Sequence, residues 1–168
     1  MVNADLARAV EVVGNVVDPE LPLVTLADLG VVRDVAVDGG RVTVTLTPTY
    51  TGCPAMREMA EDVRRSLCSA GFDEVEVRSA LSPAWSSDWI SPEGRRKLEE
   101  AGVAPPLPAP SRARERVPLA LRRRQRPVCC PRCGSARTRL QSTFSSTACK
   151  ALYRCAACAE PFEYFKEL

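Results

Sequence analysis

Two CxxC motifs near the C-terminal end of the chain restrict its fold more than any other feature. Cys130 and Cys133 form the first motif, Cys155 and Cys158 form the second, and 21 residues separate them. A CxxC turn holds two thiolates close enough to bind one ion, and two such turns complete the tetrahedron that Zn²⁺ prefers. The chain contains no histidine, which excludes Cys₂His₂ sites and histidine-bearing catalytic zinc sites. We therefore expect a closed, structural Cys₄ zinc site, with disulfides or unrelated thiols as the alternative.

The 168 residues divide by composition into two domains and a linker. Residues 128–168 contain too few apolar side chains for an independent core, so bound metal is expected to stabilise them. Prolines dominate residues 104–110, and residues 111–127 contain seven arginines and one glutamate. Such composition is typical of an extended linker. We assign residues 1–102 to a first domain, 103–127 to the linker and 128–168 to a zinc ribbon.

The arginine run has a second interpretation, an anionic partner such as nucleic acid or a CoA phosphate. A solvated linker is the commoner outcome for a run of like charges. The run also lacks aromatic residues that could stack on bases, so a nucleic-acid-binding zinc ribbon is kept only as the alternative function.

The sequence also lacks the features of membrane and secreted proteins. No stretch is apolar enough to span a bilayer, and the N-terminus has neither the basic nor the apolar region of a signal peptide. Eight cysteines in such a chain are expected to be reduced. We therefore expect a cytoplasmic protein with no membrane partner.

Apolar periodicity predicts an α+β fold for the first domain. The predicted elements, in chain order, are helix 5–17, strands 31–37 and 42–46, helix 54–70, strand 75–81 and helix 92–101. Asp38-Gly39-Gly40 joins the first two strands as a hairpin. We expect the helices to cover one face of a small sheet made of this hairpin and the third strand.

Cys53 is the candidate reactive thiol of the first domain because it lies between Gly52 and Pro54. Proline favours the first helical position, so Cys53 is expected at the N-cap of the second helix. The free N–H groups and the dipole there would stabilise a thiolate and lower its pKa. Nucleophilic catalysis normally needs a base, and the chain has no histidine, so metal or iron–sulfur handling is the better functional interpretation. A buried structural cysteine is the alternative.

The other cysteines have less informative surroundings. Cys149, between the CxxC motifs, is a spare ligand, a redox thiol or a strand residue, and we expect zinc to bind without it. Cys129 does not have the CxxC spacing to Cys133, so it is a weaker candidate ligand than Cys130. Cys68, late in the second helix, is expected to be a packing or surface thiol.

Three further residues are ambiguous on spacing alone. Asp18, before Pro19, is either a turn residue or a carboxylate that assists the thiol. Trp85 and Trp89 either anchor a partner or fold their segment back onto the core, and we expect the second.

Several motifs resemble known families. The first domain is similar to the iron–sulfur cluster assembly domain of SufT-like proteins and eukaryotic cytosolic cluster-targeting factors. The motifs that carry this similarity are Asp18-Pro-Glu-Leu-Pro, Asp28-Leu-Gly30, Thr47-Pro-Thr-Tyr-Thr-Gly-Cys-Pro54 and Pro83-Ala-Trp-Ser-Ser-Asp-Trp89. The tail resembles one branch only, the PaaD family, whose members are encoded with the bacterial ring-1,2-phenylacetyl-CoA epoxidase. Its motifs are Cys130-Pro-Arg-Cys-Gly-Ser135, Ser146-Thr-Ala-Cys-Lys-Ala-Leu-Tyr-Arg-Cys-Ala-Ala-Cys158 and Glu160-Pro-Phe-Glu-Tyr-Phe-Lys166.

This resemblance implies an accessory or maturation factor and not an enzyme. In that system an oxygenase pair epoxidises the substrate at a di-iron centre, and a flavin and iron–sulfur reductase delivers electrons. The resemblance implies insertion of an iron–sulfur cluster or iron, with the reductase as the client among the epoxidase subunits. When the roles of the family's residues are carried over to this chain, the resemblance implies that Cys53 handles a transient cluster or iron and that Asp18 assists it. It also implies that the four CxxC cysteines hold structural Zn²⁺. A thiol oxidoreductase is a third hypothesis, but two facing CxxC motifs favour metal over redox chemistry.

Overall fold

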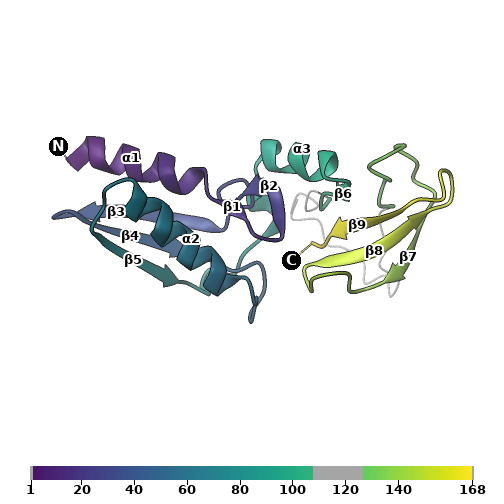
Figure 1. Cartoon of the computed structure of the whole chain (residues 1–168). Helices are drawn as coiled ribbons and strands as arrows, with labels where there is room; N and C mark the ends of the chain where they lie inside the picture. Colours follow the sequence, from purple (N-terminus) through teal and green to yellow (C-terminus); the bar gives the residue numbers. More distant parts are fainter. Residues whose placement is uncertain (1, 108–126, 168) are drawn as a thin grey trace, which may run out of the picture. The chain divides into compact units, whose positions relative to one another are not determined.

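The computed structural model describes residues 2–107 and 127–167, and these divide into two compact units with their boundary in the chain between Ala101 and Gly102 (Figure 1). Unit 1 contains α1 (Val2–Gly14), β1 (Val17–Asp18), β2 (Leu21–Thr25), β3 (Val32–Asp38), β4 (Arg41–Leu46), α2 (Met56–Ser69), β5 (Glu74–Ser79), the 3₁₀ turn η1 (Ser87–Trp89) and α3 (Pro92–Glu100). Unit 2 contains β6 (Val103–Ala104), β7 (Thr138–Ser142), β8 (Lys150–Cys155) and β9 (Pro161–Phe165). No helix in the described residues has the length and apolarity needed to cross a bilayer.

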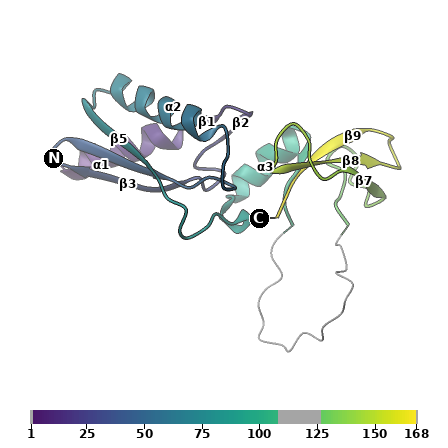
Figure 2. The same cartoon turned by 90° about the horizontal axis from the view of Figure 1, so that it is seen from below.

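A three-stranded sheet with the order β3-β4-β5 forms the centre of unit 1. β3 and β4 are antiparallel and joined at Gly39 and Gly40, whose positive φ values fit the predicted hairpin. β5 runs parallel to β4, and α2 makes the crossover between them. Val42, Val44 and Leu46 are fully buried, which confirms the predicted alternation along β4. Contacts of α1 with β3 and of α2 with β5 place both helices against this sheet, and Figure 2 shows the same elements from a second direction.

The first helix ends three residues earlier than predicted. α1 stops at Gly14, and Val17 begins β1 instead of completing a helical face. Val13 is buried, whereas Val10 is 50% exposed, so the apolar periodicity that predicts a helix over residues 5–17 does not mark one buried face. The physical reason is that the chain leaves the helix to form the small β1–β2 ladder, next to which the carbonyl of Val16 accepts the N–H of Leu26 at 2.8 Å. Tertiary pairing thus overrides the helical pattern of the valines.

Both tryptophans fold the segment after β5 back onto the core, as expected. The indole N–H of buried Trp85 donates to the carbonyl of Leu29 at 2.9 Å. Gly30 has φ +67° and lies so close to Trp89 that an added Cβ would sit 2.6 Å from the Trp89 Cβ. The guanidinium of Arg33 covers the Trp89 ring at 3.6 Å. These contacts tie the segment to the β2–β3 connection.

The predicted last helix of unit 1 is confirmed, and its cap is joined to a partly buried carboxylate. Ser91 is the N-cap of α3, and its hydroxyl accepts the N–H of Gly94 at 2.8 Å. The carboxylate of Asp28 accepts the Ser91 hydroxyl at 3.2 Å, the Lys97 ammonium at 2.6 Å and the Thr25 N–H at 3.2 Å. Asp28 therefore fastens α3 to the end of β2.

Unit 2 is a four-stranded sheet with the order β6-β9-β8-β7. Its core residues are Ala104, Val128, Cys130, Ala151, Cys155, Phe162 and Tyr164. Val103 and Ala104 pair in parallel with β9, so the expectation that the linker begins at residue 103 was wrong. The sequence signal was weak because two residues before a proline run show no periodicity. Most of the predicted arginine-rich linker, residues 108–126, lies outside the described residues.

Candidate metal centre and thiol site

The structure brings the four CxxC cysteines together at one end of the unit 2 sheet. All four sulfur atoms lie within 4.8 Å of one another, with 3.8 Å between Cys130 and Cys158 and 3.6 Å between Cys133 and Cys155. A Zn–S bond of about 2.3 Å in a regular tetrahedron sets neighbouring sulfurs about 3.8 Å apart. A disulfide would require about 2.05 Å, and all four cysteines are free. The donor set therefore fits one structural Zn²⁺ with no open coordination position.

The two CxxC turns have the same backbone geometry. In each, the N–H of the first cysteine donates to the carbonyl five residues later, at 3.0 Å in both cases. The residue after the second cysteine has a positive φ in each turn, +69° at Gly134 and +64° at Ala159. Glycine adopts this conformation without cost, whereas alanine does not. The second turn thus holds a strained residue to reach the same ligand geometry.

Backbone N–H groups prepare Cys155 to bind metal. The N–H groups of Cys158, foremost, and of Ala157 act together with hydrogen bonds from the Cys133 and Cys158 thiols to lower the pKa of Cys155 to about 6, although burial opposes them. The Ala157 nitrogen lies 3.3 Å from the Cys155 sulfur. Zinc binds the thiolate, so these donors favour the metal-bound state.

The other cysteines of the described residues lie outside the four-sulfur cluster. Cys149 is buried immediately before β8, with its sulfur 3.0 Å from the Thr147 hydroxyl and its carbonyl bonded to the Lys166 N–H at 2.9 Å. Cys129 and Cys68 are exposed. The geometry agrees with the expectation that zinc binds without Cys149.

Cys53 does not cap the second helix, contrary to expectation. α2 begins at Met56 with Ala55 as its N-cap, so Cys53 lies two residues before the cap. The carbonyl of Cys53 accepts the N–H of Met56 at 3.4 Å, which makes residues 53–56 a turn with Pro54 second. Proline is favoured at the second position of a turn as well as at the first position of a helix. Here Pro54 takes the turn position, and the helix begins two residues later. The thiol is half-buried.

The expectation that the helix start lowers the thiol pKa was also wrong. Burial raises the pKa of Cys53, and the carboxylates of Glu20 and Asp18 raise it further. The N–H groups of Ala55 and Met56 donate to the sulfur and act in the opposite direction, but they do not outweigh burial. At neutral pH the resting group is therefore a thiol and not a thiolate.

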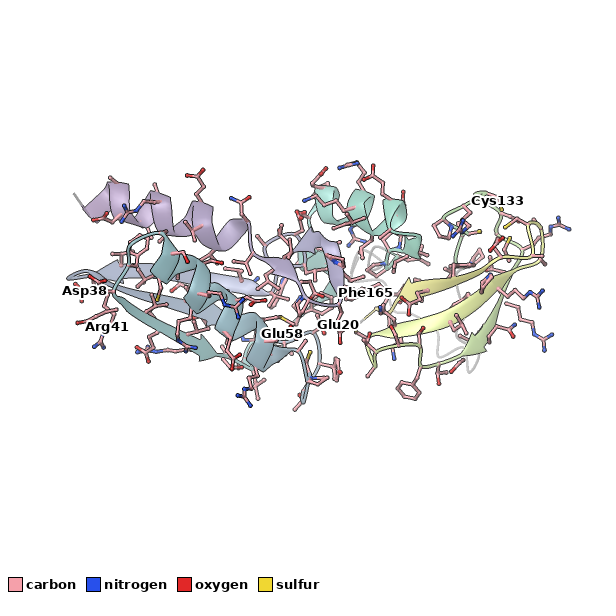
Figure 3. The ribbon with its side chains drawn as sticks, in the orientation of Figure 1. Glu20, Asp38, Arg41, Glu58, Cys133 and Phe165 are labelled. Atoms are coloured by element: carbon pink, nitrogen blue, oxygen red, sulfur yellow. The ribbon has the colours of Figure 1, made fainter. Side chains whose placement is uncertain are left out.

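Asp18 has the first of the two roles that the sequence left open, that of a turn residue. Its carboxylate is buried and accepts the N–H groups of Glu20 at 2.8 Å and Leu21 at 2.9 Å, so it builds the β1–β2 turn. It also acts electrostatically on Cys53. Glu20 was not expected to act on the thiol, although its position in the same turn was the available signal. Figure 3 shows Glu20 and Glu58 at the end of unit 1 where α2 begins.

The segment that leads to Cys53 also lines a largely apolar hollow of about 260 Å³. Residues 47–51 form one side of it, and Leu81, Ala84 and Trp85 form the other. Leu81 is 59% exposed. The half-buried thiol thus belongs to a loop that also presents apolar surface.

Family profiles match both units. Residues 6–79 match the profile described as "Iron-sulfur cluster assembly protein", and residues 114–166 match the "PaaD zinc beta ribbon domain". The crystal structure of a domain of unknown function (DUF59) from Bacillus anthracis superposes with a TM-score of 0.53 at 30% identity, covering 57% of this chain and 92% of that one. These matches confirm the α+β domain followed by a zinc ribbon.

Two similar proteins carry functional names. An "Fe-S protein maturation auxiliary factor" of Porphyromonas gingivalis is 38% identical over 53% of this chain and 86% of its own length. A protein of Escherichia coli K12, named as one subunit of a "Putative 1,2-phenylacetyl-CoA epoxidase", is 45% identical over 89% of this chain and 85% of its own length. Because this second match spans most of both chains and the zinc-ribbon profile agrees with it, the chain belongs to the PaaD family of phenylacetyl-CoA epoxidase subunits.

Proposed function

We propose that this protein is a cytoplasmic accessory factor that helps to mature a phenylacetyl-CoA epoxidase. Its cargo is an iron–sulfur cluster or iron, its client is the iron–sulfur reductase of that complex, and Cys53 is the thiol that handles the cargo. Family membership supports the maturation role, since relatives of unit 1 are named as iron–sulfur maturation factors. The protein catalyses no step of the epoxidation itself.

The environment of the Cys53 sulfur is the observation that carries this proposal. A thiol with a raised pKa binds metal weakly at neutral pH because the proton competes with the metal for the sulfur. Once cargo displaces the proton, the N–H groups of Ala55 and Met56 stabilise the metal-bound thiolate. The two effects together give a ligand that accepts cargo and also releases it, as a transfer factor requires.

The number of available thiolates also favours transfer over storage. Iron–sulfur clusters are held mainly by four cysteine thiolates. In unit 1 the cysteines are Cys53 and the exposed Cys68, which lies near the far end of α2. Cys53 therefore supplies one ligand, and the donor or the client supplies the others.

The zinc ribbon has a separate, structural role in this proposal. Its four cysteines close the coordination sphere, so no position is left for cargo. Removal of zinc would unfold unit 2 because its core is small.

Co-expression of the reductase with and without this chain tests the proposal. We expect the reductase purified from cells that contain the chain to hold more iron and sulfide per protomer. The oxygenase subunits, co-expressed in the same way, serve as the control for client choice. Equal cluster occupancy of the reductase in both strains would refute the maturation role.

A further inference from the structure

Two exposed arginines face each other on the zinc-ribbon sheet. Arg139 of β7 and Arg154 of β8 are direct partners in the antiparallel ladder. Directly opposed residues of antiparallel strands point to the same face of the sheet. Tyr153 and Cys155, on either side of Arg154, pack towards the core of unit 2. The two arginines, called the arginine pair below, therefore occupy the open face.

The arginine pair forms no ion pair with another described residue, and Glu163, on the same face, is paired with Lys150. Neither side chain takes part in a salt bridge within the described residues, whereas six arginines in the described part of unit 1 are paired with carboxylates. The Arg154 Nε donates to the Ala159 carbonyl at 3.2 Å, which fixes its direction without neutralising it. Like charges directly opposite each other destabilise a sheet. An anionic partner on this face would remove that repulsion.

The charge of the zinc site does not account for the pair. Four thiolates around one Zn²⁺ leave a local negative charge, which nearby cations can balance. Arg132 lies inside the first CxxC motif and Arg137 follows it closely, and both are exposed. These two arginines are placed for that role, while the arginine pair points away from the face that carries the Cys155 sulfur.

We propose that the arginine pair docks a carboxylate patch on the surface of the client protein, which the proposed function identifies as the epoxidase reductase. Planar guanidinium groups bind carboxylates through paired N–H donors, and arginine is enriched at protein interfaces. Two guanidiniums held side by side on rigid strands match two neighbouring carboxylates. In this arrangement the ribbon holds the client while unit 1 handles the cargo.

A nucleic acid fits this face less well. The ring of Tyr153 stacks on Phe162 and meets Tyr164 edge-on, and all three rings pack in or against the core, on the opposite face from the arginine pair. Phe144 is 63% exposed, but the Lys166 ammonium already covers it at 4.6 Å. Residues 1–107 contain 17 acidic and 10 basic side chains, so this part of the chain would repel a long polyanion, although residues 108–168 contain 4 acidic and 13 basic side chains. A local carboxylate patch avoids this repulsion.

Charge reversal of the pair in the full-length, zinc-loaded chain tests the inference. The test variant is Arg139→Glu/Arg154→Glu, and the matched control is Arg57→Glu/Arg65→Glu, which makes the same charge change on exposed residues of α2. Binding to the purified reductase is measured by calorimetry at low and high salt, with zinc content as the folding check. We expect the test variant to bind about tenfold more weakly, with a shallower salt dependence, and the control to bind like wild type. The neutral variant Arg139→Gln/Arg154→Gln should show a smaller loss in the same direction.

Several results would overturn the docking inference. They are unchanged binding by the test variant, an equal loss in the control, or failure of the wild-type chain to bind the reductase. Tighter binding to a single-stranded RNA oligonucleotide, lost on charge reversal, would assign the pair to nucleic acid. Loss of self-association in sedimentation would assign it to a second copy of the chain.

The same variants separate this inference from the proposed function. If charge reversal leaves binding intact while Cys53→Ala abolishes cluster insertion, the docking site is wrong and the maturation role stands. If the arginine pair binds the reductase but the chain never raises its cluster occupancy, docking stands and the maturation role fails.

Discussion

At the scale of single residues, Cys53 departs most from what its neighbours in the sequence suggest. Gly52 and Pro54 indicate a helix start and an activated thiolate, but the turn places the sulfur before the helix cap and beside two carboxylates. Burial, Glu20 and Asp18 act on the thiol through tertiary structure, and the residues next to Cys53 in the sequence carry no signal of them. The sequence therefore singles out Cys53 as a candidate, but it does not predict the direction of the thiol's pKa shift.

Glu20→Gln should make Cys53 more reactive. The carboxylate raises the thiol pKa, so its neutralisation should lower that pKa and increase the thiolate fraction at neutral pH. The rate of iodoacetamide alkylation of Cys53 against pH, read by mass spectrometry, measures this change, and Glu99→Gln on α3 is the control. An alkylation profile identical to wild type would show that Glu20 does not act on the thiol.

Ala159→Gly should stabilise the zinc ribbon. Alanine in the left-handed region costs about 1–2 kcal/mol in the folded state. Glycine removes this cost, but it lowers the free energy of unfolding by about 0.4–1 kcal/mol because it raises the conformational entropy of the unfolded chain. We expect a net gain of about 0.5 kcal/mol in the free energy of unfolding of zinc-loaded protein. Ala156→Gly, in the same turn without a positive φ, should instead lose stability. Equal losses in both variants would contradict the strain assigned to Ala159.

At the scale of elements, strongly periodic segments were predictable and short ladders were not. The β3–β4 hairpin, α2 and α3 follow from alternation, helical spacing and the Ser91 cap, and their ends fall within about two residues of the prediction. β1 and β6 contain two residues each and exist only because a partner strand aligns them. The end of α1 was missed for the same reason.

Asp28→Asn should weaken the attachment of α3 to unit 1. Burial alone would raise the pKa of Asp28, but hydrogen bonds from Lys97 and Thr25 outweigh it and lower the pKa. Loss of the charge should cost about 1.5–3 kcal/mol, as for hydrogen bonds to charged groups.

The lowered pKa of Asp28 also determines how its contribution to the free energy of unfolding depends on pH. It is fully present above the unfolded pKa of about 3.9 and is lost as the pH falls through the folded value. Urea unfolding at neutral and acidic pH should therefore show a difference between wild type and Asp28→Asn that shrinks in acid. A difference that stays constant with pH would refute this account.

At the scale of the whole molecule, the two units depend on different sources of stability. Unit 1 buries the apolar faces of a sheet and its helices, whereas unit 2 combines a small core with a four-cysteine metal site. The sequence predicted this division from the CxxC spacing together with the few apolar side chains of residues 128–168. It could not show that unit 2 begins at Gly102, because β6 has no periodic signal.

Cys155→Ser should release zinc and unfold unit 2 while unit 1 stays folded. Three thiolates hold Zn²⁺ more weakly than four, and the small core does not compensate. Limited proteolysis should cut residues 128–167 and spare residues 2–101, with zinc measured by atomic absorption. Cys149→Ala is the matched control and should retain full zinc. Loss of zinc in the control together with retention in Cys155→Ser would mean that the ligand set is wrong.

The cluster content of the reductase in cells that carry Cys53→Ala tests the central claim most directly. The variant should fold and keep its zinc, because Cys53 lies in unit 1 and outside the four-cysteine cluster. We predict that the reductase from these cells holds as little iron and sulfide as in cells without the chain, whereas Cys68→Ala supports normal occupancy. Normal occupancy with Cys53→Ala would contradict the account and reduce this cysteine to a packing residue.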